Sequence, residues 1–348
     1  MVSDIELAAV FMGTRAFLAR NRDAEALQLA QQGLEMARKS YLHAGAEEKR
    51  WQGLVLSNSV AALTQHATGE IESASESFDG VMSLIDHVDM RSGPPKYRDD
   101  LVPTALKQGA VLRLAERRVD EARQLSARAL TGGKKRAETL SEAEGLGGSP
   151  VLAQEQIVDA LLQQAHVYLD LEEWEEAEQA LSDALSITES LNSQGSVMQP
   201  YRGHIRVGFI LLSLAWMYSR TGRITLAEGL YRETLKIFDL NINERMGGDS
   251  TLRSELPFHP SVGALAAWRY AQLLTALPGR GTEASAWQSL ANDLYDDAPV
   301  RRVVDPIRVF GSLDMLQGKG SSGCGVVLDL MCRRALPRIP MAIESEPK

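Results

Sequence analysis

One stretch of this chain constrains its fold more than any other, the segment from Leu211 to Phe238. Within it, large, small and aromatic residues recur at helical spacing on both sides of the short break Thr221-Gly222-Arg223. The break suits a tight turn, because Gly222 can adopt the left-handed conformation that closes a helix. We therefore predict two antiparallel helices whose small residues let them approach closely while the large residues fill the space between them.

The same order of residues recurs four more times along the chain. A single helical pair of this kind cannot bury its apolar faces alone, so it requires neighbours of the same type. The first small residue of each second helix recurs at intervals of 48 to 55 residues. These residues are Ala26, Ala74, Ala122, Ala177 and Ala227. Five ordered copies predict an all-α chain of stacked helical pairs.

The order large, large, small, aromatic, glycine, small, aromatic, small resembles the tetratricopeptide (TPR) repeat. The standard period of that repeat is about 34 residues, and the longer intervals here resemble the kinesin-light-chain branch of the family. This resemblance implies an all-α, right-handed α-solenoid of five to six TPR-like hairpins. We expect a repeat domain over residues 1–297 and a C-terminal cap with a flexible tail over residues 298–348. The expected hairpins cover residues 4–40, 46–88, 99–131, 151–191, 201–240 and 261–295.

Several local expectations follow from turn and capping residues. The Gly-Gly pairs and mixed charges of residues 131–150 indicate a mobile loop that flanks a possible helical piece. Ser261 is expected to cap the helix that follows it. The segment Gly323–Pro337 is expected to add one more helix to the cap. We find no sustained strand alternation anywhere in the sequence.

Charge and apolar patterning argue against two classes of partner. The net charge of -9 is the opposite of what a nucleic acid or an anionic membrane surface attracts. No apolar run approaches the roughly 18 residues that a membrane span needs. The cysteines, Cys324 and Cys332, form no disulfide framework, which favours an intracellular and cytoplasmic protein. An organelle lumen stays open if a presequence was removed, and homo-oligomers stay open because solenoid ends can pair.

None of the motifs that could carry chemistry has the sequence context that its chemistry requires. Residues 318–323 spell G-x-G-x-x-G, but only 25 residues follow Gly323, too few to complete a dinucleotide-binding βαβ unit. The two cysteines lack the close Cys or His neighbours of a zinc site. The glutamates of residues 172–178 suit a solvated helix start better than acid–base work. We predict no catalytic residue, no cofactor and no metal.

In TPR-repeat proteins, which this sequence resembles, the first helix of each pair lines the concave surface. Aligning the small residues places a mixed apolar and charged set on that surface, with Trp216 as a candidate anchor. The predicted partner-binding residues are Phe11, Arg15, Lys107, Leu162, His166, Asp170, Phe209, Trp216 and Arg220. Alternatively, Trp216 packs between neighbouring helices and the chain's own tail fills the groove. The Lys and Asn residues of a chaperone carboxylate clamp are mostly missing.

The leading hypothesis is a non-catalytic scaffold or adaptor that binds a partner protein or peptide on its concave face, within a larger assembly. The first alternative is a TPR regulator whose curvature responds to a short peptide. The second is an enzyme with a site in the C-terminal segment. An RNA-reading helical repeat is disfavoured by the acidic charge.

Overall fold

The computed structural model describes most of the chain as packed helices. The described residues are 4–20, 22–43, 47–68, 70–89, 95–142, 150–193, 200–240, 242, 258–296, 326–329 and 333–338. They form twelve helices in consecutive packed pairs, which makes the protein an all-α solenoid, plus one small sheet. The first three pairs are α1 (Asp4–Ala19) with α2 (Asp23–His43), α3 (Glu47–Thr68) with α4 (Ile71–Asp89), and α5 (Pro95–Ala115) with α6 (Val119–Glu142). The next three are α7 (Pro150–Asp170) with α8 (Trp174–Ser193), α9 (Pro200–Arg220) with α10 (Ile224–Ile237), and α12 (Pro260–Thr275) with α13 (Gly281–Asp296).

In the first five pairs, the two helices are joined by a turn that repeats one backbone hydrogen bond. The first residue after the turn donates its amide to a carbonyl five residues earlier, as Arg223 does to Tyr218 at 2.8 Å. Gly222 has a φ of 79°, which confirms the predicted left-handed residue. Arg117 and Glu172 adopt the same conformation in the turns of two earlier pairs, with φ of 62° and 57°.

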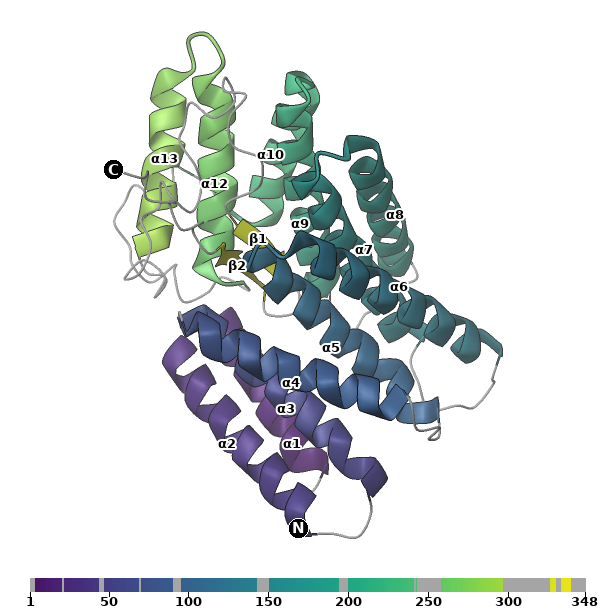
Figure 1. Cartoon of the computed structure of the whole chain (residues 1–348). Coiled ribbons are helices and arrows are strands. Elements are labelled where there is room, and N and C mark those ends of the chain that lie inside the picture. The colour runs from purple at the N-terminus through teal and green to yellow at the C-terminus, as the bar shows by residue number, and fades with distance from the viewer. Residues whose placement is uncertain are drawn as a thin grey trace, which may run out of the picture.

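The first helices form an inner layer along the stack, and the second helices lie outside it (Figure 1). Each first helix packs against the first helix of a neighbouring pair, in the order α1, α3, α5, α7, α9 and α12. Each second helix packs against its own partner and against the first helix of the next pair. This layering is how a repeat protein buries one continuous core without a central sheet.

Small residues set how closely the helices approach. A Cβ atom on Gly109 of α5 would lie 1.8 Å from Cζ of Phe78 on α4. Phe78 is completely buried, so its ring has no free space into which to move. The glycine is therefore required by packing and not by backbone conformation.

Replacing Gly109 with alanine should destabilise the fold. We expect the free energy of unfolding to fall by about 1–3 kcal/mol, because the added methyl group overpacks the contact with Phe78. Gly229 in α10 is the matched control, since nothing lies within 4 Å of a Cβ added there. Gly229→Ala should instead raise stability by up to about 1 kcal/mol through helix propensity. Urea denaturation followed by circular dichroism measures both, and equal effects at the two sites would contradict the packing explanation.

Residues 131–142 are not the predicted mobile loop, and their helix is longer than the helical piece that the prediction left possible. They continue α6 as far as Glu142. A Cβ on Gly132 would lie 2.8 Å from Cγ of Pro103 in α5, and one on Gly133 would lie 3.4 Å from Ile157 in α7. The two glycines lower helix propensity by about 1 kcal/mol each, but they let α6 pack closely between α5 and α7. Residues 143–149 lie outside the described part.

The C-terminal segment corrects a second prediction. We expected Gly323–Pro337 to add a helix, whereas its described residues form an antiparallel pair of strands, β1 (Val326–Asp329) and β2 (Arg334–Pro337). A short apolar run such as Val326-Val327-Leu328 fits a buried strand as well as a buried helix, and its β-branched residues favour the strand. The hairpin lies within the stack, with β1 against α5 and β2 against α12 (Figure 1).

Two helix starts also differ from expectation. The cap of α12 is His259, whose ring accepts a hydrogen bond from the Ser261 amide, so Ser261 is not the cap. Pro260 occupies the first turn, where a missing amide proton costs nothing. The helix α5 begins at Pro95, earlier than the expected residue 99, and includes Pro103. The Gly-rich residues 318–323, Cys324 and Cys332 lie outside the described residues, so the structure does not bear on them.

Candidate functional site

The inner face of the solenoid holds a hairpin, by which we mean the described residues 326–329 and 333–338, so in this structure it is not the open trough that the leading hypothesis assumed. We call this surface the inner face, meaning the start of α2 and the sides of α1, α3, α5, α7, α9 and α12 that meet the hairpin or one another. One side of the hairpin presents Val327 and Leu336 to Val111 of α5 and Val167 of α7. The other side presents Val326, Leu328 and Ala335 to the large core of the C-terminal pairs. These apolar side chains of the hairpin are all nearly inaccessible.

The backbone of β2 is held by the start of α12. The Ala335 amide donates a hydrogen bond to Ser261 Oγ at 3.0 Å, and Ser261 Oγ lies 3.3 Å from the Ala335 carbonyl, to which it can donate. The His259 amide donates to the Arg333 carbonyl at 2.9 Å. The inner face thus recognises an extended main chain, as a neighbouring strand would.

An ion pair joins the hairpin to the first helical pair. Arg334 donates from both terminal nitrogens to the two carboxylate oxygens of Asp23, at 2.9 and 3.1 Å. Asp23 begins α2, so its negative charge also suits the partial positive charge of the helix N-terminus. Both side chains are almost fully buried, and such a bidentate pair is directional as well as strong.

A second ion pair joins the hairpin to the fourth helical pair. Arg338, just after β2, donates to the carboxylate of Asp170, the last residue of α7. Both side chains are buried. Arg117, in the turn after α5, lies close enough for Arg338 to lower its pKa, although burial is the larger cause. Hairpin contacts therefore tie the first, third, fourth and last pairs together.

A second buried cluster of charges lies between α5, α7 and α9. The ammonium group of Lys107 donates to Asp159 at 3.2 Å, and Arg206 contacts both Asp159, at 3.3 Å, and Glu155, at 2.8 Å. Burial raises the pKa of Asp159, but Lys107 and Arg206 outweigh it and hold the pKa below its ordinary value. Burial lowers the pKa of Lys107, since a carboxylate shared with Arg206 offsets only part of the desolvation. The groups neutralise one another and form no reactive acid–base pair.

Three buried histidines surround the hairpin arginines. Burial, and to a smaller extent repulsion from Arg334, lowers the pKa of His66 to about 4. The same two causes hold the pKa of His259 well below its ordinary value. Burial, Arg269 and Arg338 lower the pKa of His166 to about 3. Each of these rings is therefore neutral near pH 7.

The predicted site residues separate into two groups on the inner face. Near the first three pairs, Phe11 is half-buried under the guanidinium of Arg15, and Lys107 is buried against Asp159. Arg15 is close enough for its charge to lower the pKa of both Lys107 and Asp159. The alignment thus brought Arg15 and Lys107 into one neighbourhood, but it did not identify Asp159 as the group between them.

The second group gathers near Arg338. Asp170 pairs with Arg338, and His166 Nε2 lies 3.2 Å from Ser213 Oγ. Trp216 is half-buried, with Arg269 over its ring at 4.7 Å and Trp174 at 6.4 Å. Arg220 lies 3.8 Å from Glu172.

Four predicted residues are buried, not exposed as expected: Lys107, Leu162, His166 and Phe209. Leu162 and Phe209 are completely buried within the large apolar core. Phe209, for example, meets the ring of Phe238 edge-on at 6.0 Å. The roles of the nine residues in binding a partner stay predictions.

Of the residues that hold the hairpin, Asp170 was predicted from the sequence, whereas Asp23 and Ser261 were missed. Asp23 is of a residue type that commonly caps helices, and Ser261 was predicted to be such a cap. The available signal was two arginines, Arg334 and Arg338, at alternate strand positions around Leu336, within a segment that we interpreted as a helix. Their partners lie up to 311 residues away, which no local pattern reveals.

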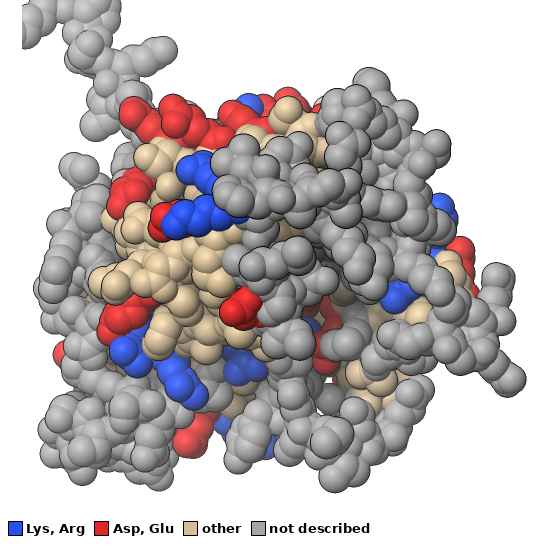
Figure 2. Space-filling view, turned by 90° about the horizontal axis from the view of Figure 1, so that it is seen from below, with Lys and Arg blue, Asp and Glu red and all other residues tan. Residues whose placement is uncertain are grey.

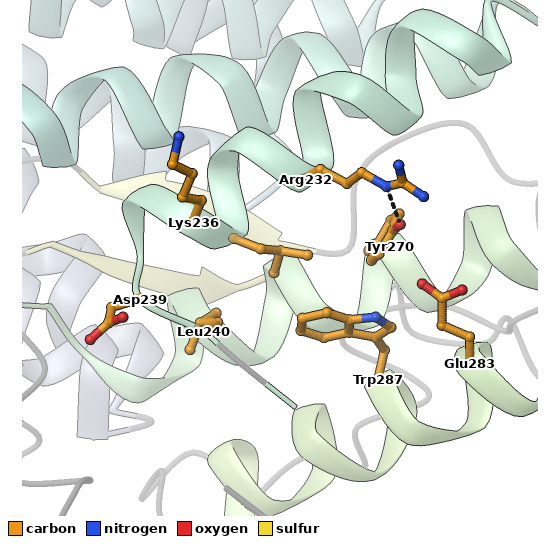
Figure 3. A pocket seen from close by; sticks show the side chains of 8 residues that line it. Arg232, Lys236, Asp239, Leu240, Tyr270, Glu283 and Trp287 are labelled. Atoms are coloured by element: carbon orange, nitrogen blue, oxygen red, sulfur yellow. Dashed lines mark hydrogen bonds between the residues drawn. The ribbon is translucent and has the colours of Figure 1, made fainter. Parts of the chain in front are cut away.

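A separate pocket opens between α10, α12 and α13 (Figure 3). It encloses about 520 Å³ and is lined by Arg232, Leu235, Lys236, Asp239, Leu240, Tyr270, Glu283 and Trp287. Arg232 Nε donates to the Tyr270 hydroxyl at 3.1 Å, and the ring of Tyr270 meets that of Trp287 edge-on at 5.5 Å. Its mixed charges and aromatic floor carry no nucleophile beside a base.

The described surface shows mixed charge (Figure 2) and no cluster of metal-ligating side chains. On the face shown in Figure 2, described acidic and basic side chains are interspersed around a broad uncharged area. Among the described residues, no group of three or more His, Cys, Asp or Glu side chains is placed to hold a metal ion. Within the same residues, no helix has the length and apolar character needed to cross a membrane.

Comparisons with known proteins place the fold. No family model matches the sequence, and no curated protein matches it. Among solved structures, the crystal structure of BtubC (BKLC) from P. vanneervenii is similar, with a TM-score of 0.50 and 18% sequence identity. The match covers 80% of this chain and 92% of that chain. Together with the stacked helical pairs described above, this likeness shows that the chain is a helical-repeat protein.

Proposed function

We propose that the protein is a non-catalytic interaction scaffold whose inner face binds an extended segment of a partner protein. The observation that carries the proposal is that this face already binds a polypeptide, the hairpin. It does so with main-chain hydrogen bonds from Ser261, apolar contacts at Val111 and Val167, and ion pairs from Asp23 and Asp170. These are the contacts by which proteins hold extended peptides.

The charges on the inner face support binding over catalysis. A catalytic acid or base needs a pKa near the working pH and a reacting group within reach. Asp159 is instead held between Lys107 and Arg206, and the described buried histidines are kept neutral by desolvation. In this proposal, residues 1–297 form the binding domain inside the cell and residues 298–348 supply the segment that occupies it.

One observation favours the alternative of a peptide-responsive regulator. The hairpin contacts α2 through Arg334, α7 through Arg338 and α12 through Ala335, so it links the two ends of the repeat array. A peptide that took its place would remove these links together. Such a peptide would change the relative stability of two arrangements of the repeats, as population shift requires.

The scaffold proposal predicts that a partner is lost when the inner face is altered. Trp216→Ala removes a half-buried ring between Arg269 and Trp174, and a tryptophan anchor is typically worth about 2 kcal/mol or more to an interface. We expect native affinity purification with quantitative mass spectrometry to show at least roughly a tenfold loss of the captured partner. Leu226→Ala is the control, because Leu226 is an exposed apolar residue at the start of α10.

Both variants should keep the helical circular dichroism of the wild type at the assay temperature and melt well above it, so that binding is compared between folded proteins. Equal capture by wild type and Trp216→Ala would contradict binding on this part of the inner face. Failure of the wild type to enrich any protein over a mock purification would contradict the scaffold proposal as a whole.

A further inference from the structure

The hairpin presents three side chains to the inner face at alternate positions of one extended segment. Arg334, Leu336 and Arg338 are each two residues apart, which is the spacing that places side chains on one side of a strand. Each of them meets a different partner: Asp23 of α2, the apolar pair Val111 and Val167, and Asp170 of α7.

We propose that the inner face is a receptor for an extended Arg-x-Leu-x-Arg segment of a partner protein, and that residues 334–338 occupy it as an internal copy of that segment. The inference rests on the proposed scaffold function and specifies the chemistry of its partner. An arginine must reach each carboxylate, a branched apolar residue must lie between them, and the main chain must be extended.

The two carboxylates make the receptor selective for arginine. Asp23 accepts two parallel hydrogen bonds from Arg334, at 2.9 and 3.1 Å, a geometry that the single ammonium group of lysine cannot reproduce. Asp170 accepts from Arg338 at the other end. A segment without the matching arginine would leave the buried carboxylate of Asp23 without the bidentate pair, and Asp170 without its partner Arg338 although near the charge of Arg117, so other sequences are disfavoured.

The main-chain contacts add affinity without adding sequence preference. Ser261 Oγ accepts from the Ala335 amide at 3.0 Å and lies within hydrogen-bonding distance of the Ala335 carbonyl. Any extended segment in the same register offers the same two groups. Specificity therefore comes from the alternate side chains, as in other cases where a peptide is added as a strand.

Two features make the internal copy replaceable. A two-stranded hairpin is at best marginally stable in water, so this one depends on the repeats for its structure. The inner face also has hydrogen-bonding capacity that the hairpin leaves unused. Both ring nitrogens of His66, next to Arg334, have no hydrogen-bond partner among the described residues. The same holds for both side-chain polar atoms of Gln108, which lies on α5, the helix that β1 packs against.

The internal copy also has an advantage, because it is part of the same chain. Its effective concentration at the receptor is high, so a separate segment of equal chemistry competes poorly. Weakening the internal copy should therefore reveal binding of a segment added in solution.

The probe is a fluorescein-labelled synthetic peptide with the sequence of residues 333–338, measured by fluorescence anisotropy with the full chain. We expect the double variant Arg334→Ala/Arg338→Ala to bind it at least roughly tenfold more tightly than the wild type does. A scrambled peptide of the same composition controls for attraction to the acidic protein and should not bind. Adding Asp23→Asn and Asp170→Asn to the double variant should abolish binding of the probe.

The proposal is overturned if the folded double variant does not bind the probe, or if the scrambled peptide binds equally well. Those results leave the scaffold proposal intact when a partner is still lost on Trp216→Ala. Should that partner be absent as well, both proposals fail.

Hydrogen exchange on the wild type tests the same idea without any variant. The backbone amides of Leu328 and Ala335 should exchange faster than those in the middle of α7, and an excess of the unlabelled peptide should accelerate them further. Protection of the hairpin equal to that of α7, unchanged by the peptide, would show a permanent structural element and would overturn the proposal even if the double variant did not fold.

Discussion

Replacing Asp159 with alanine is expected to lower the free energy of unfolding by about 3–5 kcal/mol, because it leaves buried cations without their counterion. Lys107 is only 2% exposed and has Asp159 as its carboxylate partner at 3.2 Å. Arg206 keeps a contact with Glu155 at 2.8 Å, so most of the cost falls on Lys107. Urea denaturation followed by circular dichroism at pH 7 gives the size of the loss.

A matched double variant separates the charge from the packing. Lys107→Met removes the ammonium group and keeps an unbranched side chain of similar length, so Lys107→Met/Asp159→Leu replaces the pair with apolar groups. Such replacements of buried ion pairs are often neutral or stabilising. We expect the double variant to recover more than half of the stability lost in Asp159→Ala. A loss below about 1 kcal/mol in the single variant would mean that water reaches the cluster.

The same cluster sets an acid limit on stability. Because the pKa of Asp159 is lower in the folded protein than in the unfolded chain, its pairing stabilises the fold above the unfolded value of about 3.9. That contribution is lost as the pH falls through the lower, folded value. Above about pH 5, the effect of Asp159 should therefore be independent of pH.

The helical pairs were predictable because the pattern that encodes them is local. The small residue Ala227, the turn at Gly222 and the aromatic residue Phe238 lie within one helical pair, and their spacing alone fixes how the two helices meet. Where contacts between distant segments determine the conformation, the local sequence pattern gave a wrong prediction. Gly132 looked like a loop residue, but the nearby ring of Pro103 makes it a packing residue inside α6.

The candidate site was less predictable than the fold, for two physical reasons. The concave positions were assigned as if the inner face were open, whereas cross-stack contacts bury Leu162 and Phe209 completely. In addition, the chemistry depends on pairs far apart in sequence. Asp23 and Arg334 are 311 residues apart, and each alone has the pattern of a helix residue. Only the closed three-dimensional arrangement shows that they meet.

Lowering the pH from 7 to 5 is expected to destabilise the protein strongly through its three described buried histidines. The folded pKa of His66 is about 4 and that of His166 about 3, both because burial disfavours the charged ring. The unfolded value is about 6.5. Between these values the unfolded chain binds more protons than the folded protein, so stability is present at neutral pH and is lost as the pH falls below about 6.5.

The expected size follows from linkage. Well below pH 6.5, each such histidine makes the free energy of unfolding fall by nearly 1.4 kcal/mol for each pH unit that the pH is lowered. Summed between pH 7 and pH 5, the loss is about 2 kcal/mol per histidine. His259, whose pKa is also held well below its ordinary value, adds a third contribution of the same sign. His66 and His166 together can remove roughly 4 kcal/mol, a large fraction of a typical folding free energy. Urea denaturation at pH 7, 6 and 5 measures the slope.

Replacing the buried histidines with uncharged residues should make the free energy of unfolding depend less on pH. His66→Leu removes a ring whose nitrogens have no hydrogen-bond partner among the described residues, and His166→Gln keeps a group that can reach Ser213. Each should reduce the loss between pH 7 and pH 5 by about 2 kcal/mol. Glu35→Gln, in an exposed pair with Lys39, is the control and should leave the slope unchanged. A wild-type slope that these histidine variants do not alter would contradict the assignment.

The location of the three rings determines where acid should act first. Protonation places a positive charge beside Arg334 for His66 and His259, and beside Arg269 and, second, Arg338 for His166. Much of the repulsion therefore falls on the two arginines that hold the hairpin, and release of the hairpin would let the rings reach water at a lower cost than global unfolding. Hydrogen exchange at pH 5.5 should show the amides of β1 and β2 losing protection before those of α7. Simultaneous loss in the hairpin and in α7 would instead place the acid transition in the whole repeat array.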